Sequence, residues 1–318
     1  MTQLDQRDLR PLGIGELLDR AVTLLVRRFA VLALILALVA IPLAIIQYAS
    51  SPATAGLAAQ IQALLTLPPG HPEEQRAILR QLSAGNRLGP LGFGLVVLSA
   101  VLSTLSTTAC MIGVAQAYAG RLPSVRAAYR AALGRWLPQL VAVVAFVAFG
   151  FILAVVLTLA AVFVAVAVVA LSKVSHPAAL LLGIPSAALF AVVFLGVTVL
   201  LYFAAQMSLV AIALEDPNPI RGIAQGLRRT LSPPIFWRSA LVAGAVFAVS
   251  LIGSLILLAV AGGMSALTRI DALYPVIAVI GGVALNALLT TFMVVYTFDV
   301  RVRREGYDLA VAAQGPPP

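Results

Sequence analysis

Six long runs of apolar residues, separated by polar segments, divide this chain. The runs lie at 29–48, 91–119, 139–171, 179–213, 240–263 and 275–298. Each contains at least the roughly 20 residues that an α-helix needs to cross the hydrocarbon core of a bilayer. The pattern therefore predicts an all-α integral membrane protein with six transmembrane helices, packed as a bundle.

The third and fourth runs are longer than one crossing requires. A helix as long as the run at 139–171 extends over roughly 50 Å, against a core of about 30 Å. The whole stretch from 139 to 213 has only 75 residues, too few for four spans of about 18 residues with their turns. We therefore expect two tilted or protruding helices here.

The composition excludes a water-soluble domain. Charged residues make up only 10% of the chain, against roughly 25% in ordinary soluble domains. The net charge of +9 does not indicate nucleic-acid binding, because the basic residues lie between the spans and not on one solvated face. Cys110 is the only cysteine, so neither a disulfide framework nor a thiolate cluster for a metal can form.

The basic residues predict the orientation of the chain. The segments 1–28, 120–138, 214–239 and 299–318 carry 16 of the 21 Lys and Arg residues, and the other gaps carry five. Because Lys and Arg near span ends are retained in the cytoplasm, we expect these four segments and both termini to be cytoplasmic. Twenty of the 21 basic residues are Arg, a bias typical of GC-rich bacterial genomes, so the expected location is the bacterial cytoplasmic membrane.

Three of the cytoplasmic segments are predicted to contain amphipathic helices at the membrane surface. The first, within 1–28, carries an apolar stripe comprising Leu17, Leu18, Ala21, Leu24 and Leu25. The second, in 120–138, begins after Pro123 with Ser124 as its N-cap. The third, in 214–239, follows Pro219, with Ile220, Ile223, Leu227 and Leu231 apolar and Arg221, Gln225, Arg228 and Arg229 polar.

Each amphipathic helix precedes two spans. The chain is therefore predicted to be a single membrane domain, 1–318, built from three repeats of an amphipathic helix plus a transmembrane hairpin. The largest outer gap, 49–90, is expected to form an extracytoplasmic cap. Its helix would start at Pro72 and end before Gly85.

Candidate chemistry is sparse. His71 and His176 are the only histidines, so the spacing assembles neither a metal cluster nor a Ser-His-Asp arrangement. No charged residue lies in the middle of a span, which argues against a proton relay or ion-coupled pump. We therefore expect no catalytic residue, no metal and no cofactor.

Uncharged polar residues inside the spans form a candidate polar groove. They are Gln47, Ser99, Ser103, Ser106, Gln116, Gln206 and Asn286. Small and hydroxyl residues of this kind usually serve close helix packing. The alternative is a groove for a lipid headgroup, since buried amides in lipid must face protein or water.

Acidic and basic residues near the predicted inner face form a candidate ionic cluster. Its members are Glu16, Asp19, Arg20, Arg228, Arg229, Asp299, Arg301 and Arg303. Glu215 and Asp216, at the end of the fourth run, are expected to form further interfacial ion pairs. Arginines at this level also contact anionic lipid headgroups, so membrane lipids are the expected partners, with a protein partner as a second expectation and no nucleic acid.

Three segments resemble the glycerophosphoryl diester phosphodiesterase membrane-domain family. They are 10–21 (RPLGIGELLDRA), 227–238, with Leu227 to Thr230 and Phe236 to Arg238, and 299–309 (DVRVRREGYDL). The resemblance implies a six-helix membrane unit that in some relatives is joined to a soluble phosphodiesterase domain. A catalytic barrel of that kind needs about 250 residues, and the longest soluble piece here, 49–90, is far shorter.

The sequence therefore predicts a non-catalytic membrane protein that acts as a scaffold or accessory subunit and organises lipid or a partner protein. Two alternatives remain open. One is a transporter or lipid-handling protein with a polar groove between helices, and the other is a membrane subunit of a lipid-metabolising enzyme.

Overall fold

The structure, a computed structural model, describes residues 13–50, 73, 76, 90–173, 175–270 and 273–305. Within these ranges the chain forms eight α-helices and no β-strand. They are α1 (Ile14–Ser50), α4 (Pro90–Tyr118), α5 (Val125–Leu133), α6 (Trp136–Ser172), α7 (His176–Leu214), α8 (Pro219–Leu231), α9 (Pro233–Thr268) and α10 (Leu273–Glu305). Apart from Glu73 and Arg76, the predicted outer cap lies outside the described residues, as does the tail from 306 onward.

Six of these helices are long and apolar enough to cross a membrane, as predicted. Three of them extend well beyond their apolar runs. α1 begins at Ile14, not at 29, because it includes the amphipathic segment, α9 begins at Pro233, not at 240, and α10 continues to Glu305, not 298. Hydropathy does not predict the extensions of α9 and α10, because they carry charged residues; among these, Arg238 and Arg303 pair with Asp299.

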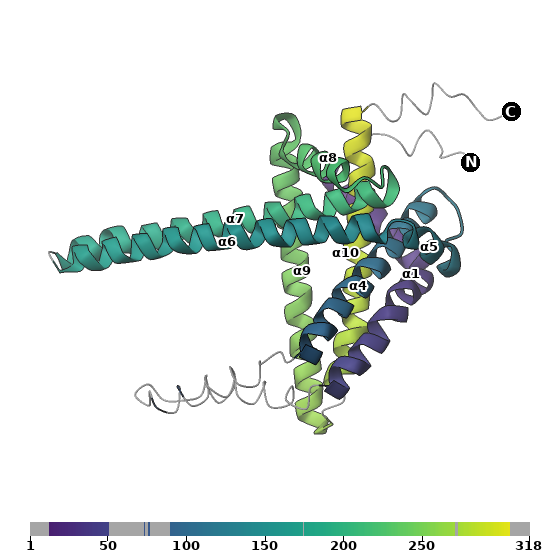
Figure 1. Cartoon of the computed structure of the whole chain (residues 1–318), viewed down its shortest axis with the longest axis horizontal. Helices are drawn as coiled ribbons and strands as arrows, with labels where there is room; N and C mark the ends of the chain where they lie inside the picture. Colours follow the sequence, from purple (N-terminus) through teal and green to yellow (C-terminus); the bar gives the residue numbers. More distant parts are fainter. Residues whose placement is uncertain are drawn as a thin grey trace.

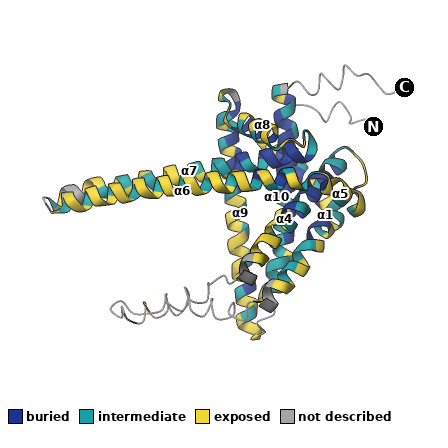
Figure 2. Ribbon diagram, viewed as in Figure 1, coloured by how far each residue is buried: buried dark blue, intermediate teal, exposed yellow. Residues whose placement is uncertain are grey.

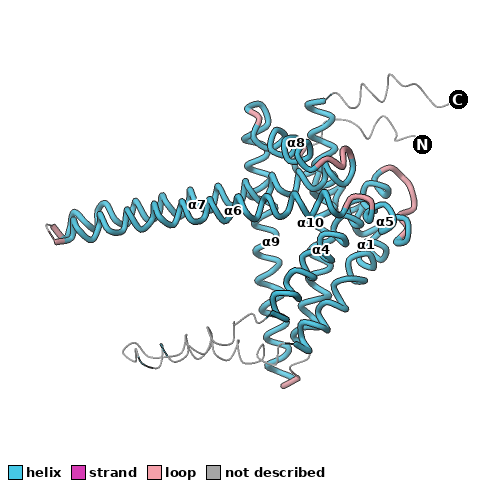
Figure 3. Tube along the Cα trace, viewed as in Figure 1, coloured by secondary structure: helices cyan, strands magenta, loops and turns pink. Residues whose placement is uncertain are grey.

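The long helices form three consecutive pairs, α1 with α4, α6 with α7, and α9 with α10 (Figure 3). An amphipathic element precedes each pair. α5 and α8 precede the second and third pairs, and the start of α1 precedes the first. α1 bends at Arg28, whose φ of −126° and ψ of 18° interrupt the helical backbone. The order of elements therefore follows the predicted threefold pattern along the chain.

The second pair is oriented differently from the other two. α6 and α7 run side by side, crosswise to α9 and α10, and project away from the remaining helices (Figure 1). None of the residues in the most apolar stretch of α6 is buried. The predicted six long helices are present, but α6 and α7 do not lie parallel to α9 and α10. Large apolar side chains contact lipid as readily as protein, whereas small and hydroxyl residues, abundant in α4, specify close helix neighbours.

The core lies where the C-terminal end of α7 meets α1, α4 and α10 (Figure 2). Phe203, Met207 and Tyr296 are among its largest buried side chains. The rings of Phe203 and Tyr296 lie 5.4 Å apart between centroids. This packing fixes the end of α7, around which the polar residues are arranged.

The amphipathic elements differ in which residues they bury. At the start of α1, Leu17, Ala21 and Leu25 of the predicted stripe are buried and Glu16 is exposed, but Leu18, also predicted in the stripe, is 40% exposed. α8 instead buries Arg229, which is 3% exposed, and leaves Ile220 77% exposed. Its predicted apolar face is therefore divided, since Ile220 and Leu231 are exposed, as in a helix that lies against lipid, whereas Ile223 packs against the core.

Candidate functional site

Ionic contacts converge on Glu215, the residue that follows α7. Its two carboxylate oxygens accept hydrogen bonds from Nη1 and Nη2 of Arg229, each at 2.8 Å. Arg301 of α10 places its Nε 3.7 Å from the same carboxylate. A paired, two-point contact of this kind is the strongest geometry available to arginine and a carboxylate. Glu215 therefore joins α7, α8 and α10.

A second ionic centre forms around Asp299 of α10, which is 2% exposed. Nη2 of Arg238, on α9, donates to its Oδ2 at 2.9 Å, and Nε of Arg303 donates to both oxygens at 3.1 and 3.2 Å. About one helical turn before Asp299 in α10, the hydroxyl of Tyr296 shares a hydrogen bond of 3.0 Å with the hydroxyl of Ser239 in α9. These contacts tie the start of α9 to the end of α10.

Two glycines bring α8 close to α7. A Cβ on Gly222 would overlap the side chain of Ile212, and a Cβ on Gly226 would overlap both the backbone and the hydroxyl of Ser208. Glycines four residues apart occupy one face of a helix and allow two backbones to approach closely. Asn218 caps the helix, since its Oδ1 accepts from the backbone N–H of Ile220 at 3.0 Å. This spacing is visible in the sequence as G-x-x-x-G.

Half of the predicted ionic cluster meets at this end of the protein. Arg229, Asp299, Arg301 and Arg303 form the two centres just described, and Arg228 lies beside them on α8. Glu16, Asp19 and Arg20 are instead on the first turns of α1, where Glu16 accepts a hydrogen bond from the N–H of Gly13 at 3.1 Å. The cluster as predicted omitted Glu215 and Arg238. The sequence predicts an ion pair for Glu215 at the end of the fourth run but does not assign Arg229 as its partner.

Two further groups at this end have shifted pKa values. The pKa of the exposed Asp216 is lowered, first by a hydrogen bond from the backbone N–H of Asn218 at 2.9 Å and then by Arg221. Tyr129 of α5 donates its hydroxyl to the carbonyl of Ile35 at 2.7 Å. Burial raises its pKa to about 12.

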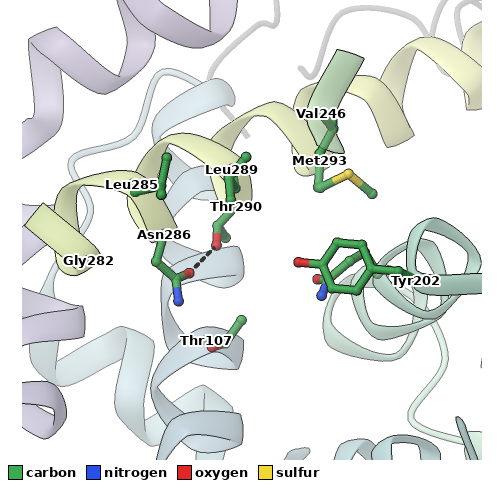
Figure 4. A pocket seen from close by; sticks show the side chains of 10 residues that line it. Thr107, Tyr202, Val246, Gly282, Leu285, Asn286, Leu289, Thr290 and Met293 are labelled. Carbon is green, nitrogen blue, oxygen red and sulfur yellow. Dashed lines mark hydrogen bonds between the residues drawn. The ribbon is translucent and has the colours of Figure 1, made fainter. Parts of the chain in front are cut away.

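The second region is a cavity of about 270 Å³ between α4, α7, α9 and α10 (Figure 4). Thr107, Tyr202, Gln206, Asn286 and Thr290 supply its polar lining, and Leu285, Leu289, Met293 and Val246 most of its apolar lining. The hydroxyl of Thr290 donates to Oδ1 of Asn286 at 3.0 Å. The cavity thus combines hydroxyl and amide groups with an apolar wall, which suits an amphipathic ligand.

Two residues of the predicted groove, Gln206 and Asn286, line this cavity. Ser99 and Ser103 instead bond back to carbonyls of their own helix, at 2.8 and 3.1 Å, and Ser106 is buried. This behaviour is typical of hydroxyls that serve packing. Gln116 is half-buried and is not part of the lining, while the side chain of Gln47 lies outside the described residues.

A buried amide that the sequence reasoning missed joins three helices. Gln139, at the start of α6, accepts from the hydroxyl of Thr108 at 2.5 Å and donates to the carbonyl of Leu209 at 2.9 Å. Arg135 similarly donates to the carbonyls of Ile212 and Ala213 at the end of α7. Since the carbonyls at a helix C-terminus carry partial negative charge, this guanidinium stabilises the end of α7.

Within the described ranges, no group of three His, Cys, Asp or Glu residues lies close enough to hold a metal ion. The single thiol, Cys110, is fully buried. The carboxylates of Glu215 and Asp299 are engaged by arginines. The described polar groups are therefore arranged to join helices, to present positive charge and to line a cavity.

The fold and these sites define a class: a multi-pass helical membrane protein with an arginine-rich end and an amphipathic cavity between its helices. The chain belongs to the family described as "Domain of unknown function (DUF8558)", whose profile matches residues 2–296. Neither a curated protein nor a solved structure matches this chain. The resemblance to the glycerophosphoryl diester phosphodiesterase membrane-domain family stays a prediction.

Proposed function

We propose that this protein is a non-catalytic membrane scaffold or accessory subunit that organises lipid or a partner protein. One observation carries the proposal, the projecting pair α6–α7. Phe163 of α6 is 76% exposed and Leu181 of α7 is 74% exposed. Helices that are apolar on all sides must be covered by lipid or by another protein, because their exposure to water is costly.

The proposed orientation places the arginine-rich end, with both chain termini, in the cytoplasm of a bacterial cell. Contacts between the predicted cytoplasmic segments support their location on one side of the membrane. Arg135, which follows α5, reaches the end of α7, and Arg304 of α10 reaches the carbonyl of Arg228 on α8. Because segments rich in Arg are retained in the cytoplasm, the end at which they gather is assigned to the cytoplasmic side.

The scaffold proposal is tested by replacing Phe163 in the full chain with a photo-crosslinking amino acid and illuminating native membranes. We expect crosslinks to lipid or to one defined protein. The same residue at Met111, which is fully buried, is the control and should give only crosslinks within the chain. If position 163 also gave only crosslinks within the chain, the hairpin would be covered by the protein itself and the proposal would fail.

The cavity between α4, α7, α9 and α10 favours lipid handling as a second function. Its volume of about 270 Å³ suits a headgroup and not a whole lipid, because drug-sized ligands already occupy pockets of about 300–1,000 Å³. The purified protein in vesicles would then accelerate transfer of a fluorescent phospholipid between leaflets. Gln206→Leu and Asn286→Leu should slow this transfer. A scaffold without this function would leave the transfer rate equal to that of empty vesicles.

A further inference from the structure

A second cavity, which we name the arginine pocket, lies at the α8 end of the protein. It has a volume of about 320 Å³ and is lined by Gln225, Arg228 and Arg229 of α8 and by Arg304 of α10. All four lining side chains are polar, and three of them carry a permanent positive charge. A cavity of this composition is suited to an anion.

Among the described side chains, the pocket has more positive than negative charge. Arg229 is engaged by the carboxylate of Glu215. Among the described residues, no carboxylate lies within ion-pair distance of Arg228 or Arg304. Arg304 donates through Nη1 to the backbone carbonyl of Arg228, which orients its guanidinium at the pocket. Two guanidinium groups thus remain to bind an anion.

Gln225 adds an independent observation. Its Oε1 is buried and has no hydrogen-bond partner. An unsatisfied buried amide costs free energy unless a ligand or water satisfies it. Because the oxygen and nitrogen of the amide can exchange places, this end of Gln225 can donate to an anion. Gln225 is therefore a third polar side chain of the pocket that can contact an anion.

The surroundings of the pocket indicate where its anion comes from. Ile220 and Leu231 of α8 are 77% and 49% exposed, and Trp237 at the start of α9 is 76% exposed. Exposed apolar and aromatic side chains beside arginines are typical of the level of lipid headgroups. At this level the abundant anion is a lipid phosphate, which arginine binds through two parallel hydrogen bonds.

We propose that the arginine pocket binds the phosphate group of an anionic phospholipid, with Arg228, Arg304 and Gln225 as its ligands. Arg229 forms the wall and is held in place by Glu215. This inference names the lipid chemistry for the lipid-organising function proposed above and rests on it.

Short-chain phosphatidic acid, added to the delipidated full chain in detergent, tests the pocket. We expect saturable binding that raises the melting temperature, because a ligand of the folded state stabilises it. The double variant Arg228→Gln/Arg304→Gln should bind about tenfold or more weakly, since each lost charged hydrogen bond weakens affinity severalfold or more. Arg121→Gln/Arg126→Gln, at exposed arginines outside the pocket, is the matched control and should bind as the wild type does.

Two further ligands distinguish the contribution of the phosphate group to binding from that of the acyl chains. Diacylglycerol with the same chains has no phosphate and should bind much more weakly than phosphatidic acid. Inorganic phosphate should compete only weakly, because it lacks the chains that lie against α8. Equal binding of diacylglycerol, full displacement by inorganic phosphate, or equal losses in the pocket and control variants would each overturn the proposal. If the double variant does not fold, Gln225→Leu must weaken binding instead.

The proposal for the arginine pocket and the proposal of a scaffold are tested independently. Absence of phosphatidic acid binding with an intact lipid or protein crosslink at position 163 would overturn the pocket alone. Binding of phosphatidic acid without any such crosslink would support the pocket and overturn the scaffold based on α6–α7.

Discussion

Arg229 holds Glu215 through two hydrogen bonds of 2.8 Å while only 3% of Arg229 is exposed. The pair joins the end of α7 to α8 at the border of the core. A buried ion pair of this kind contributes little over an apolar replacement, but removing one partner leaves the other charge unpaired in a poorly hydrated place. The pair therefore makes the position of α8 depend on both side chains.

Glu215→Gln should destabilise the protein by about 3–5 kcal/mol, because it removes the carboxylate charge that the buried Arg229 guanidinium engages through two hydrogen bonds. The measurement is the free energy of unfolding in detergent, by denaturant titration. The pair Arg221–Asp216 offers a matched control, since it joins the same segments at 3.3 Å but its arginine side chain is 73% exposed. Arg221→Gln should cost far less, because an exposed ion pair contributes little to stability. Equal costs for the two variants would contradict the structural role of Arg229.

Gly226→Ala should destabilise the packing of α8 on α7. The added Cβ would overlap the backbone of Ser208, which cannot move as a flexible side chain can, so we expect a cost of about 1–3 kcal/mol. Gly244→Ala in α9 is the control, because no atom lies within 4 Å of its Cβ position. That substitution should be neutral or stabilising by up to about 1 kcal/mol. Comparable losses in both variants would show that α8 is not closely packed.

Hydropathy and charge were enough to predict the six long helices, the three amphipathic elements and the excess length of α6 and α7. They did not predict the crosswise direction of that pair, because Phe163 and its apolar neighbours carry no preference between lipid and protein. The ionic cluster was predicted only in part, because some of its partners are far apart in the sequence. Asp299 and Arg303 are four residues apart in one helix, whereas Glu215 and Arg229 meet only through the turn between α7 and α8.

Thiol labelling should show whether the cavity between α4, α7, α9 and α10 holds water. In a Cys110→Ala background, Asn286→Cys should react with a polar maleimide, because Asn286 is exposed and lines the cavity. Thr108→Cys, a neighbour of the cavity that is fully buried, should not react. Maleimides require the thiolate, which does not form in an apolar surrounding. Failure of the cysteine at 286 to react would favour close packing over a polar groove.

Tyr129 should make stability depend on pH in strongly alkaline solution. Burial raises its pKa to about 12 from the ordinary value of 10.0. Because the folded state keeps the proton more tightly, the contribution of Tyr129 is complete below pH 10 and is lost as the pH rises through about 12. Tyr129→Phe should therefore lose less stability than the wild type over this interval. Unfolding midpoints at successive pH values measure the difference, and parallel curves would contradict the assignment.

Lys173 is the only lysine of the chain and lies, exposed, in the turn between α6 and α7. If this hairpin crosses the membrane from a cytoplasmic start, its turn must lie outside the cell. A membrane-impermeant amine reagent should then label Lys173 in intact spheroplasts, and mass spectrometry of the peptide locates the label. Lys173→Arg should abolish it, which separates this amine from the chain's N-terminus. Labelling only after the membrane is broken would mean that α6 and α7 do not cross it, and that the proposed orientation is wrong for this pair.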